Sequence, residues 1–233
     1  MKLQQLQRLL KGIVAAAAVA ATLPAAAQSV TGGTATLTFS DDAVSTLSLI
    51  GVSVSATGSA STVTPGQVFS FPITGGTFSG DALDTVITDP AAGVTLTRGA
   101  TVITLNDFRV DRGTSTLYGD IVIGGSTTED AALYTFTSIT EDMSDFYNRQ
   151  VSASGMFITE LALNTLGDAL GVPTFLRPVV AEVDFGTLTG NVAVVPEPST
   201  YLLMGLGLAG VGLLKRRRAA SSEREPAAAP QAA

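Results

Sequence analysis

Five carboxylates are the residues of this chain whose type and spacing could support chemistry. They lie in two segments on either side of one expected strand, and they are Glu129, Asp130, Glu141, Asp142 and Asp145. Oxygen ligands of this kind suit calcium, and two carboxylates suffice for glycoside hydrolysis. The segments match neither an EF-hand loop nor a glycine-rich calcium repeat, and nothing selects a catalytic pair. Solvated acidic loops are therefore the simpler interpretation, and a calcium-stabilised adhesin is an alternative.

Missing residue types exclude most other catalytic chemistry. The chain has no histidine and no cysteine, which removes the Ser-His-Asp triad, the Cys-His dyad, the classical zinc site and the disulfide. The region 28–195 has no lysine, five arginines and seventeen acidic residues. This acidity argues against nucleic acid as a partner. We therefore expect a protein that is not an enzyme, with no catalytic residue, no metal site and no cofactor.

The beginning of the chain is organised as a signal peptide. Three cations within residues 2–11 precede an apolar stretch at 12–23 and the small-residue sequence Ala25-Ala26-Ala27. The residues expected to define cleavage are Ala25, Ala27 and Gln28. We expect residues 1–27 to be removed and the residues that follow to be exported.

The end of the chain combines three parts. Pro196, Glu197 and Pro198 resist helix and strand, because proline lacks an amide proton and restrains the residue before it. Residues 201–214 are almost wholly apolar, so they can enter a lipid bilayer, although 14 residues are fewer than the about 20 that span one as a helix. Four cations follow and hold that end in the cytoplasm; they are Lys215, Arg216, Arg217 and Arg218.

This order of parts closely resembles the PEP-CTERM sorting signal of Gram-negative bacteria, over residues 194–218. The resemblance implies that a membrane-embedded exosortase recognises Pro196, Glu197 and Pro198, and that the four cations set the topology. An ordinary C-terminal membrane anchor is the alternative. Residues 219–233 extend beyond the usual end of such a signal. They are rich in Ala, Ser, Glu and Pro, and we expect a disordered cytoplasmic tail.

The exported region, 28–193, is predicted to be mainly β. Residues 34–39 and 49–56 alternate between apolar and polar side chains, and turn signals recur at short intervals up to residue 125. A hairpin is expected from residues 102–110 and 117–123. The pattern predicts an antiparallel β-sandwich or a barrel-like domain.

The periodicity changes near the end of this region. Leucines spaced along residues 157–170 predict one amphipathic helix, which Gly171 and Pro173 would end. A last strand is expected at 179–188, before the linker to the sorting signal.

Several segments are similar to HtaA-like domains, which are secreted β-rich modules. The similarity spans about residues 65–190 and is carried by 71–76, 93–96, 105–111, 117–120 and 161–164. Some members bind haem through a tyrosine supported by histidine, but this chain has no histidine. Tyr118 or Tyr134 would have to ligate iron alone. The alternative for each is packing in a strand.

Together these features predict a non-catalytic protein of the cell surface or extracellular matrix, associated with exopolysaccharide or biofilm. Its expected partners are an exosortase, the lipid bilayer through residues 201–214, and exopolysaccharide. Before processing, the inner membrane would hold it. A ligand-binding module of the HtaA type, with haem as the ligand, is the alternative.

Overall fold

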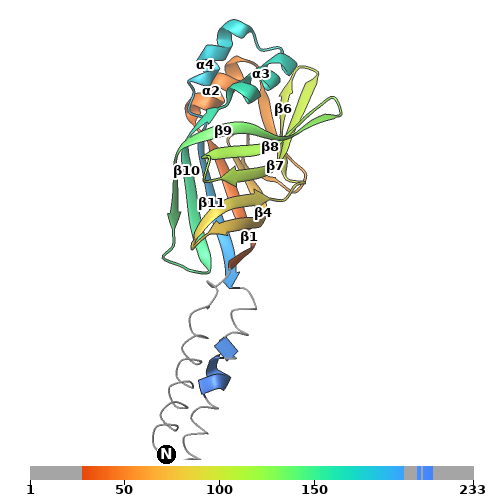
Figure 1. Cartoon of the computed structure of the whole chain (residues 1–233). Helices are drawn as coiled ribbons and strands as arrows, with labels where there is room; N and C mark the ends of the chain where they lie inside the picture. Colours follow the sequence, from red (N-terminus) through yellow and green to blue (C-terminus); the bar gives the residue numbers. More distant parts are fainter. Residues whose placement is uncertain (1–27, 197–203, 206, 212–233) are drawn as a thin grey trace, which may run out of the picture. The chain divides into compact units, whose positions relative to one another are not determined.

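The computed structural model describes residues 28–196, 204–205 and 207–211 (Figure 1). The predicted signal peptide 1–27, Glu197, Pro198, the cations 215–218 and the tail 219–233 lie outside the described residues. Residues 28–195 form one compact unit, and the residues beyond them belong to a second. In the second unit, residues 204–205 and 207–211 are helical and exposed. None of the described helices has the length and apolar character needed to cross a membrane.

Within residues 28–196 the chain forms eleven strands, three α-helices and one short 3-10 helix. The strands are β1 (Gln28–Phe39), β2 (Ser53–Thr57), β3 (Ser61–Thr64), β4 (Val68–Ser79), β5 (Ala82–Thr88), β6 (Gly93–Arg98), β7 (Thr101–Asp111), β8 (Thr116–Ile123), β9 (Ser126–Asp142), β10 (Asn148–Ile158) and β11 (Gly186–Pro196). The helices are α2 (Asp41–Leu49), α3 (Glu160–Ala169), η1 (Thr174–Leu176) and α4 (Arg177–Ala181).

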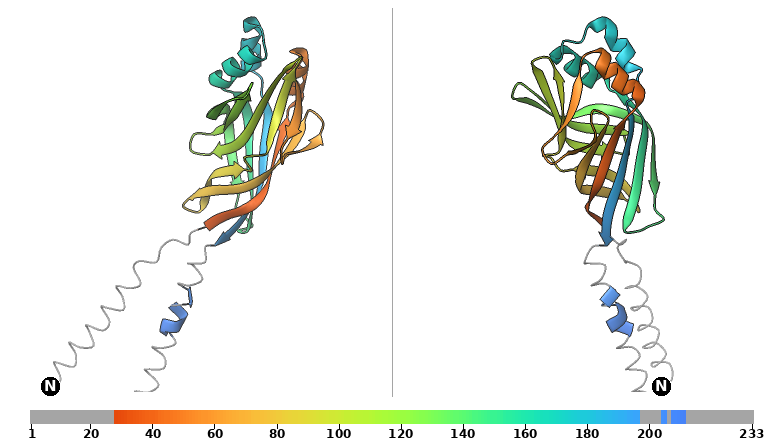
Figure 2. Two further views of the ribbon diagram at one scale, coloured as in Figure 1. Left: turned by 90° about the vertical axis from the view of Figure 1, so that its right-hand side faces the viewer. Right: turned by 180° about the vertical axis from the view of Figure 1, so that it is seen from behind.

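Most of the strands close into a ring. The order around it is β7, β5, β4, β1, β11, β10, β9 and β8, and β8 pairs back onto β7. Strands β6 and β2 continue outward from β7, and β3 pairs with β4. The registers are antiparallel, as the sequence predicted. The sheet therefore curves into a ring instead of forming a two-layered sandwich (Figure 2).

Strand β7 closes the ring because it bends in the middle. Its first half, residues 101–106, pairs with β6, whereas residues 109–111 pair with β5. Between the halves its register with β8 shifts, and Asp107 adopts a φ of 52°. Aspartate tolerates this left-handed conformation better than most residues, and a bulge of this kind bends a strand. The expected hairpin of residues 102–110 and 117–123 is confirmed, as β7 and β8.

The interior of the ring is filled by alternate side chains of each strand. Because strand side chains alternate between faces, β1 points Leu37 and Phe39 inward and places Thr36 and Thr38 on the outer side. Strand β4 adds Phe71, whose ring packs edge-on against that of Phe108 with 5.3 Å between centroids. Apolar packing inside the ring therefore holds the domain together.

The helices lie together at one end of the ring (Figure 1). Helix α2 was not expected, because the adjacent aspartates Asp41 and Asp42 are typical of a turn. Ser40 is its N-cap: the Ser40 hydroxyl accepts from the Ala43 amide at 3.0 Å, and the two aspartates occupy the first turn.

The late helix was predicted to begin at Phe157, and this start is wrong. Phe157 and Ile158 complete β10, and Thr159 caps α3 by accepting a hydrogen bond from the Ala162 amide at 3.1 Å. The hydroxyl cap, rather than the apolar periodicity, sets where the helix begins.

The last strand was predicted at 179–188, and this range is wrong too. Pro178 lies in the first turn of α4, where a missing amide proton costs nothing. The strand starts at Gly186 and continues to Pro196.

Arg98 ties two of these helices to the sheet. Its guanidinium donates to the carbonyls of Ile50, Leu170 and Gly171 at 2.6–2.7 Å. These carbonyls lie at the C-terminal ends of α2 and α3, where a cation is favourable. The helical end of the domain is thus fixed to β6.

Candidate functional site

The first and last strands of the domain are neighbours. The Thr31 hydroxyl donates to the Ala193 carbonyl at 3.3 Å, and the Ser40 amide donates to the Phe185 carbonyl at 3.1 Å, so β1 and β11 run antiparallel. Gln28 and Pro196 therefore leave the ring at the same end, away from the helices (Figure 2). We call this the terminal end of the ring.

The terminal end brings together two of the residues singled out in the sequence. Gln28 follows the expected signal-peptide cleavage, and Pro196 begins the expected sorting triplet. Val194, two residues earlier, is fully buried, so the fold reaches almost to the triplet. The other expected site residues lie outside the described residues; they are Ala25, Ala27, Glu197, Pro198, Lys215, Arg216, Arg217 and Arg218.

A buried ionic cluster lies inside the terminal end. The side chains of Arg149 and Glu141 are each only 2% exposed, and Nη1 of Arg149 lies 2.8 Å from Oε1 of Glu141. The second oxygen of Glu141 lies 2.9 Å from Nη1 of Arg112 and accepts from the Leu83 amide at 3.1 Å. The interpretation of Glu141 as part of a solvated acidic loop is therefore wrong. It is the buried counter-ion of two arginines.

The same arginine anchors the start of the domain. Nη2 of Arg149 donates to the side-chain oxygen of Gln28 at 2.8 Å, and Nη1 also donates to the carbonyl of Asp81. The rings of Phe78 and Phe146 lie 5.4 and 5.5 Å from its guanidinium carbon. A buried ion pair is favourable only when such further contacts satisfy it. This cluster links the beginning of β1 to β9, β10 and the turn between β4 and β5.

Two other carboxylates of the acidic segments organise the β9–β10 turn. Asp142 accepts from the Ser144 amide at 2.9 Å, and this hydrogen bonding lowers the pKa of Asp142. Asp145 accepts from the Asn148 side chain at 3.1 Å and from the Tyr147 amide at 2.9 Å. Those hydrogen bonds lower the pKa of Asp145. Each carboxylate therefore serves the backbone around it.

The remaining members of the acidic segments are separate from these. Asp130 pairs with Arg109 at 2.7 Å, and Glu129 is exposed. Across the part of the chain that the structure describes, no three acidic residues come together in a way that could hold a metal ion. The geometry accordingly offers no support for the calcium alternative.

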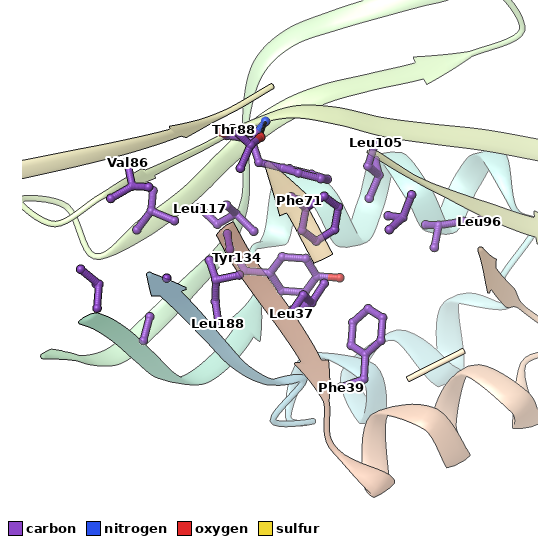
Figure 3. Close-up of a pocket in the computed structure, with 17 residues that line it drawn as sticks. Leu37, Phe39, Phe71, Val86, Thr88, Leu96, Leu105, Leu117, Tyr134 and Leu188 are labelled. Carbon is purple, nitrogen blue, oxygen red and sulfur yellow. Dashed lines mark hydrogen bonds between the residues drawn. The ribbon is translucent and has the colours of Figure 1, made fainter. Parts of the chain in front are cut away.

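The ring encloses an apolar cavity of about 60 Å³ (Figure 3). Residues of nine strands line it, among them Leu37, Phe39, Phe71, Leu105, Leu117 and Leu188. Thr88 contributes a hydroxyl that already bonds to both the amide and the carbonyl of Phe108, at 3.2 Å each. Ligand pockets usually measure about 300–1,000 Å³, so this cavity is too small for a cofactor the size of haem.

Tyr134 extends into this cavity from β9 (Figure 3). Its ring packs against that of Phe185 with 5.2 Å between centroids. Burial disfavours the ionised phenolate, and it raises the pKa of Tyr134 well above the ordinary value of 10.0. Tyr134 thus packs in a strand and is held neutral.

The high pKa of Tyr134 predicts a loss of stability in alkali. Above pH 10 the unfolded chain releases the tyrosine proton while the folded chain keeps it, so the free energy of unfolding falls by about 1.4 kcal/mol per pH unit. The stabilisation is complete below pH 10 and decreases above it. Urea unfolding at pH 9 to 11 should therefore show a flatter decline in Tyr134→Phe than in the unaltered chain. The exposed Tyr147→Phe is the control, and equal declines in the two variants would refute the assignment.

Tyr118 is also part of a strand. The guanidinium carbon of Arg109 lies 4.4 Å from the centroid of its ring, and its hydroxyl lies 3.5 Å from that of Thr114. The ring is therefore covered on one face by a cation that is itself paired with Asp130. Tyr118 does not line the apolar cavity, and Tyr134 faces a space too narrow for a large ligand.

A second hollow lies on the outer surface of the ring. It measures about 330 Å³ and crosses strands β1, β11, β10 and β9. We call it the outer groove. Its lining is rich in hydroxyl and amide groups and consists of Thr34, Thr36, Thr140, Asp142, Gln150, Val151, Ser152, Thr189, Gly190 and Asn191. The sequence signal was the run of alternating threonines and serines, but the sequence did not show that four strands would bring them side by side.

Comparisons with known proteins identify the end of the chain and the fold. The family model of the PEP-CTERM protein-sorting motif matches residues 194–218. The chain therefore carries this motif, which implies an exported protein that an exosortase processes. A comparison with curated proteins finds no match.

Among solved structures, the domain is similar to the crystal structure of the C-terminal domain of HtaA from Corynebacterium glutamicum. The TM-score is 0.50 at 13% identity, over 72% of this chain and 100% of that one. The expected similarity to HtaA is thus confirmed for the fold alone.

Proposed function

We propose that this chain is a non-catalytic surface or matrix protein that an exosortase cleaves at Pro196-Glu197-Pro198. One observation carries the proposal. The PEP-CTERM motif starts at residue 194, on the last strand of the ring, and that strand lies beside the strand that begins at Gln28. Both expected processing sites therefore adjoin the terminal end of one domain.

This placement suits release from a membrane. Before processing, residues 201–214 would hold the chain in the inner membrane and the cations 215–218 would stay in the cytoplasm. Val194 is buried and β11 ends at Pro196, so cleavage within the triplet would leave the ring complete. The domain would then be released or attached outside the cell without unfolding.

The outer groove supports association with exopolysaccharide. Its threonines, serine and amides supply donors and acceptors that match sugar hydroxyls, over a space of about 330 Å³. No aromatic ring lines it, so the contact would rest on hydrogen bonds. A matrix that contains many copies of this protein would present many such grooves, so weak binding of the polysaccharide at each groove would suffice.

Haem binding is the alternative that the HtaA-like fold raises. Only the shared fold favours haem binding. The identity to the HtaA domain is 13%, so no ligand-binding residue can be carried over from that domain. The cavity of about 60 Å³ and the absence of histidine from the sequence both oppose it. We therefore keep the surface or matrix role as the proposed function.

Cell fractionation tests the proposal through Glu197. In a host with the exosortase, the unaltered chain should reach the extracellular or surface fraction, and Glu197→Ala should remain with the inner membrane. The control is Glu182→Ala, which removes an exposed carboxylate of the domain and should be sorted normally. If Glu197→Ala leaves the membrane as readily as the control, the proposed sorting is refuted.

A further inference from the structure

The turn between β9 and β10 carries an exposed apolar group at the terminal end of the ring. Met143, Phe146 and Tyr147 are 54%, 42% and 56% exposed. We call residues 143–147 the hairpin tip. The Val194 amide donates to the Tyr147 carbonyl at 2.8 Å, so the tip lies beside β11 close to where that strand ends.

The hairpin tip is held outward by its own hydrogen bonds. Asp142 and Asp145 accept from the backbone amides of Ser144 and Tyr147, which would otherwise need water. The rings of Phe146 and Tyr147 pack edge-on, with 5.4 Å between centroids. An ordered turn thus displays the side chains of Met143 and Tyr147, whereas one side of the Phe146 ring packs against the guanidinium of Arg149 and 42% of the residue stays exposed.

The chain that follows keeps the hairpin tip near any membrane that holds residues 201–214. Five residue steps separate Pro196 from Tyr201. A fully extended chain advances about 3.3–3.6 Å per residue, so this end of β11 can lie no more than roughly 18 Å from the start of the apolar segment. The tip adjoins the same end of β11 and is therefore confined to the neighbourhood of the bilayer surface.

We infer that the hairpin tip docks into the interfacial layer of the lipid bilayer while the chain is anchored. The inference rests on the proposed membrane anchoring. Tyrosine is favoured at the interface, where its ring meets acyl chains and its hydroxyl meets water, and Met143 and Phe146 add apolar surface. Asp142 and Asp145 disfavour anionic lipid, so a zwitterionic surface is the preferred one.

Docking would orient the substrate for its processing enzyme. A single flexible tether leaves the domain free to tilt, whereas a second contact beside β11 fixes the terminal end toward the membrane. The Pro196-Glu197-Pro198 triplet then stays within a few residues of the membrane that would also hold the exosortase. Cleavage removes the tether, and the small tip alone does not retain the domain.

A tryptophan placed in the hairpin tip tests this contact. The chain contains no tryptophan, so Phe146→Trp introduces a single reporter. The full chain is reconstituted in phosphatidylcholine vesicles with brominated acyl chains, which quench tryptophan only on close approach. The matched control is Phe175→Trp, because Phe175 is 75% exposed and lies among the helices at the opposite end of the ring. Tyr147→Trp replaces the first variant if circular dichroism shows that Phe146→Trp is unfolded.

We expect brominated lipid to remove most of the fluorescence of Phe146→Trp and little of that of Phe175→Trp. If the chain floats with the vesicles but both reporters are quenched equally or not at all, the docking inference is overturned and the anchoring stands. If the chain does not float with the vesicles, the anchoring fails and the inference fails with it.

Discussion

Replacing Glu141 with alanine is expected to lower the free energy of unfolding by about 3–5 kcal/mol. Glu141 is the buried counter-ion of Arg149, at 2.8 Å, and its second oxygen contacts Arg112 at 2.9 Å. Removing it leaves the guanidinium of Arg149 charged and buried without a carboxylate partner. Urea unfolding of the full chain in detergent, followed by circular dichroism, measures the loss.

The control for this prediction lies on the same strand. Glu129 is exposed, and Glu129→Ala should change the stability by about 0.5 kcal/mol or less. A double variant, Glu141→Leu with Arg149→Met, removes both buried charges and should recover much of the lost stability. If Glu141→Ala is no less stable than Glu129→Ala, the ionic cluster does not hold the terminal end together.

Replacing Phe71 with alanine is expected to cost about 3–5 kcal/mol as well. Phe71 is 2% exposed, packs edge-on against Phe108 and lines the cavity of the ring. Its loss removes apolar contacts and enlarges the cavity of the ring. Because the strands form a closed ring, they cannot easily move inward to fill the added space. The unfolding midpoint in urea should fall accordingly.

Phe175 provides the matched control for the loss of a phenyl ring. It is 75% exposed, so Phe175→Ala should change the stability by about 0.5 kcal/mol or less. The enlarged cavity of Phe71→Ala should also bind a small apolar molecule such as benzene, which would raise its melting temperature. Equal stabilities of the two alanine variants would contradict the assignment of Phe71 to the core.

Local patterns predicted the strands that alternate cleanly. Residues 102–110 and 117–123 show both alternation and a turn between them, and they form β7 and β8. Packing fixes one residue type in this hairpin: a Cβ added at Gly119 would lie 2.8 Å from the Phe108 ring, so this position leaves room for only a glycine. The closure of the ring, however, depends on the bend at Asp107, which no periodicity signals.

The errors occurred where capping residues outweigh hydrophobic periodicity. Ser40 and Thr159 begin helices that the apolar pattern alone places elsewhere or omits. Pro178 similarly converts part of an expected strand into α4. These signals were present in the sequence, but each is a single hydroxyl or proline among many.

The ionic cluster could not have been predicted from the sequence. Its members, Gln28, Arg112, Glu141 and Arg149, are up to 121 positions apart and meet only after the ring closes. The hydrogen bond between Arg149 and Gln28 joins the expected start of the mature chain to the core. In contrast, the sorting motif at 194–218 is a continuous segment and was recognisable from the residues alone.

Mass spectrometry of the mature protein from its native host tests the central claim most directly. The account predicts a C-terminus at or beside Pro196-Glu197-Pro198 in the unaltered protein, and the loss of this cleavage in Glu197→Ala. A chain that still carries residues through Ala233 in both proteins would contradict exosortase processing. The β domain would then be a membrane-anchored module, and its cavity and outer groove would have to explain its function.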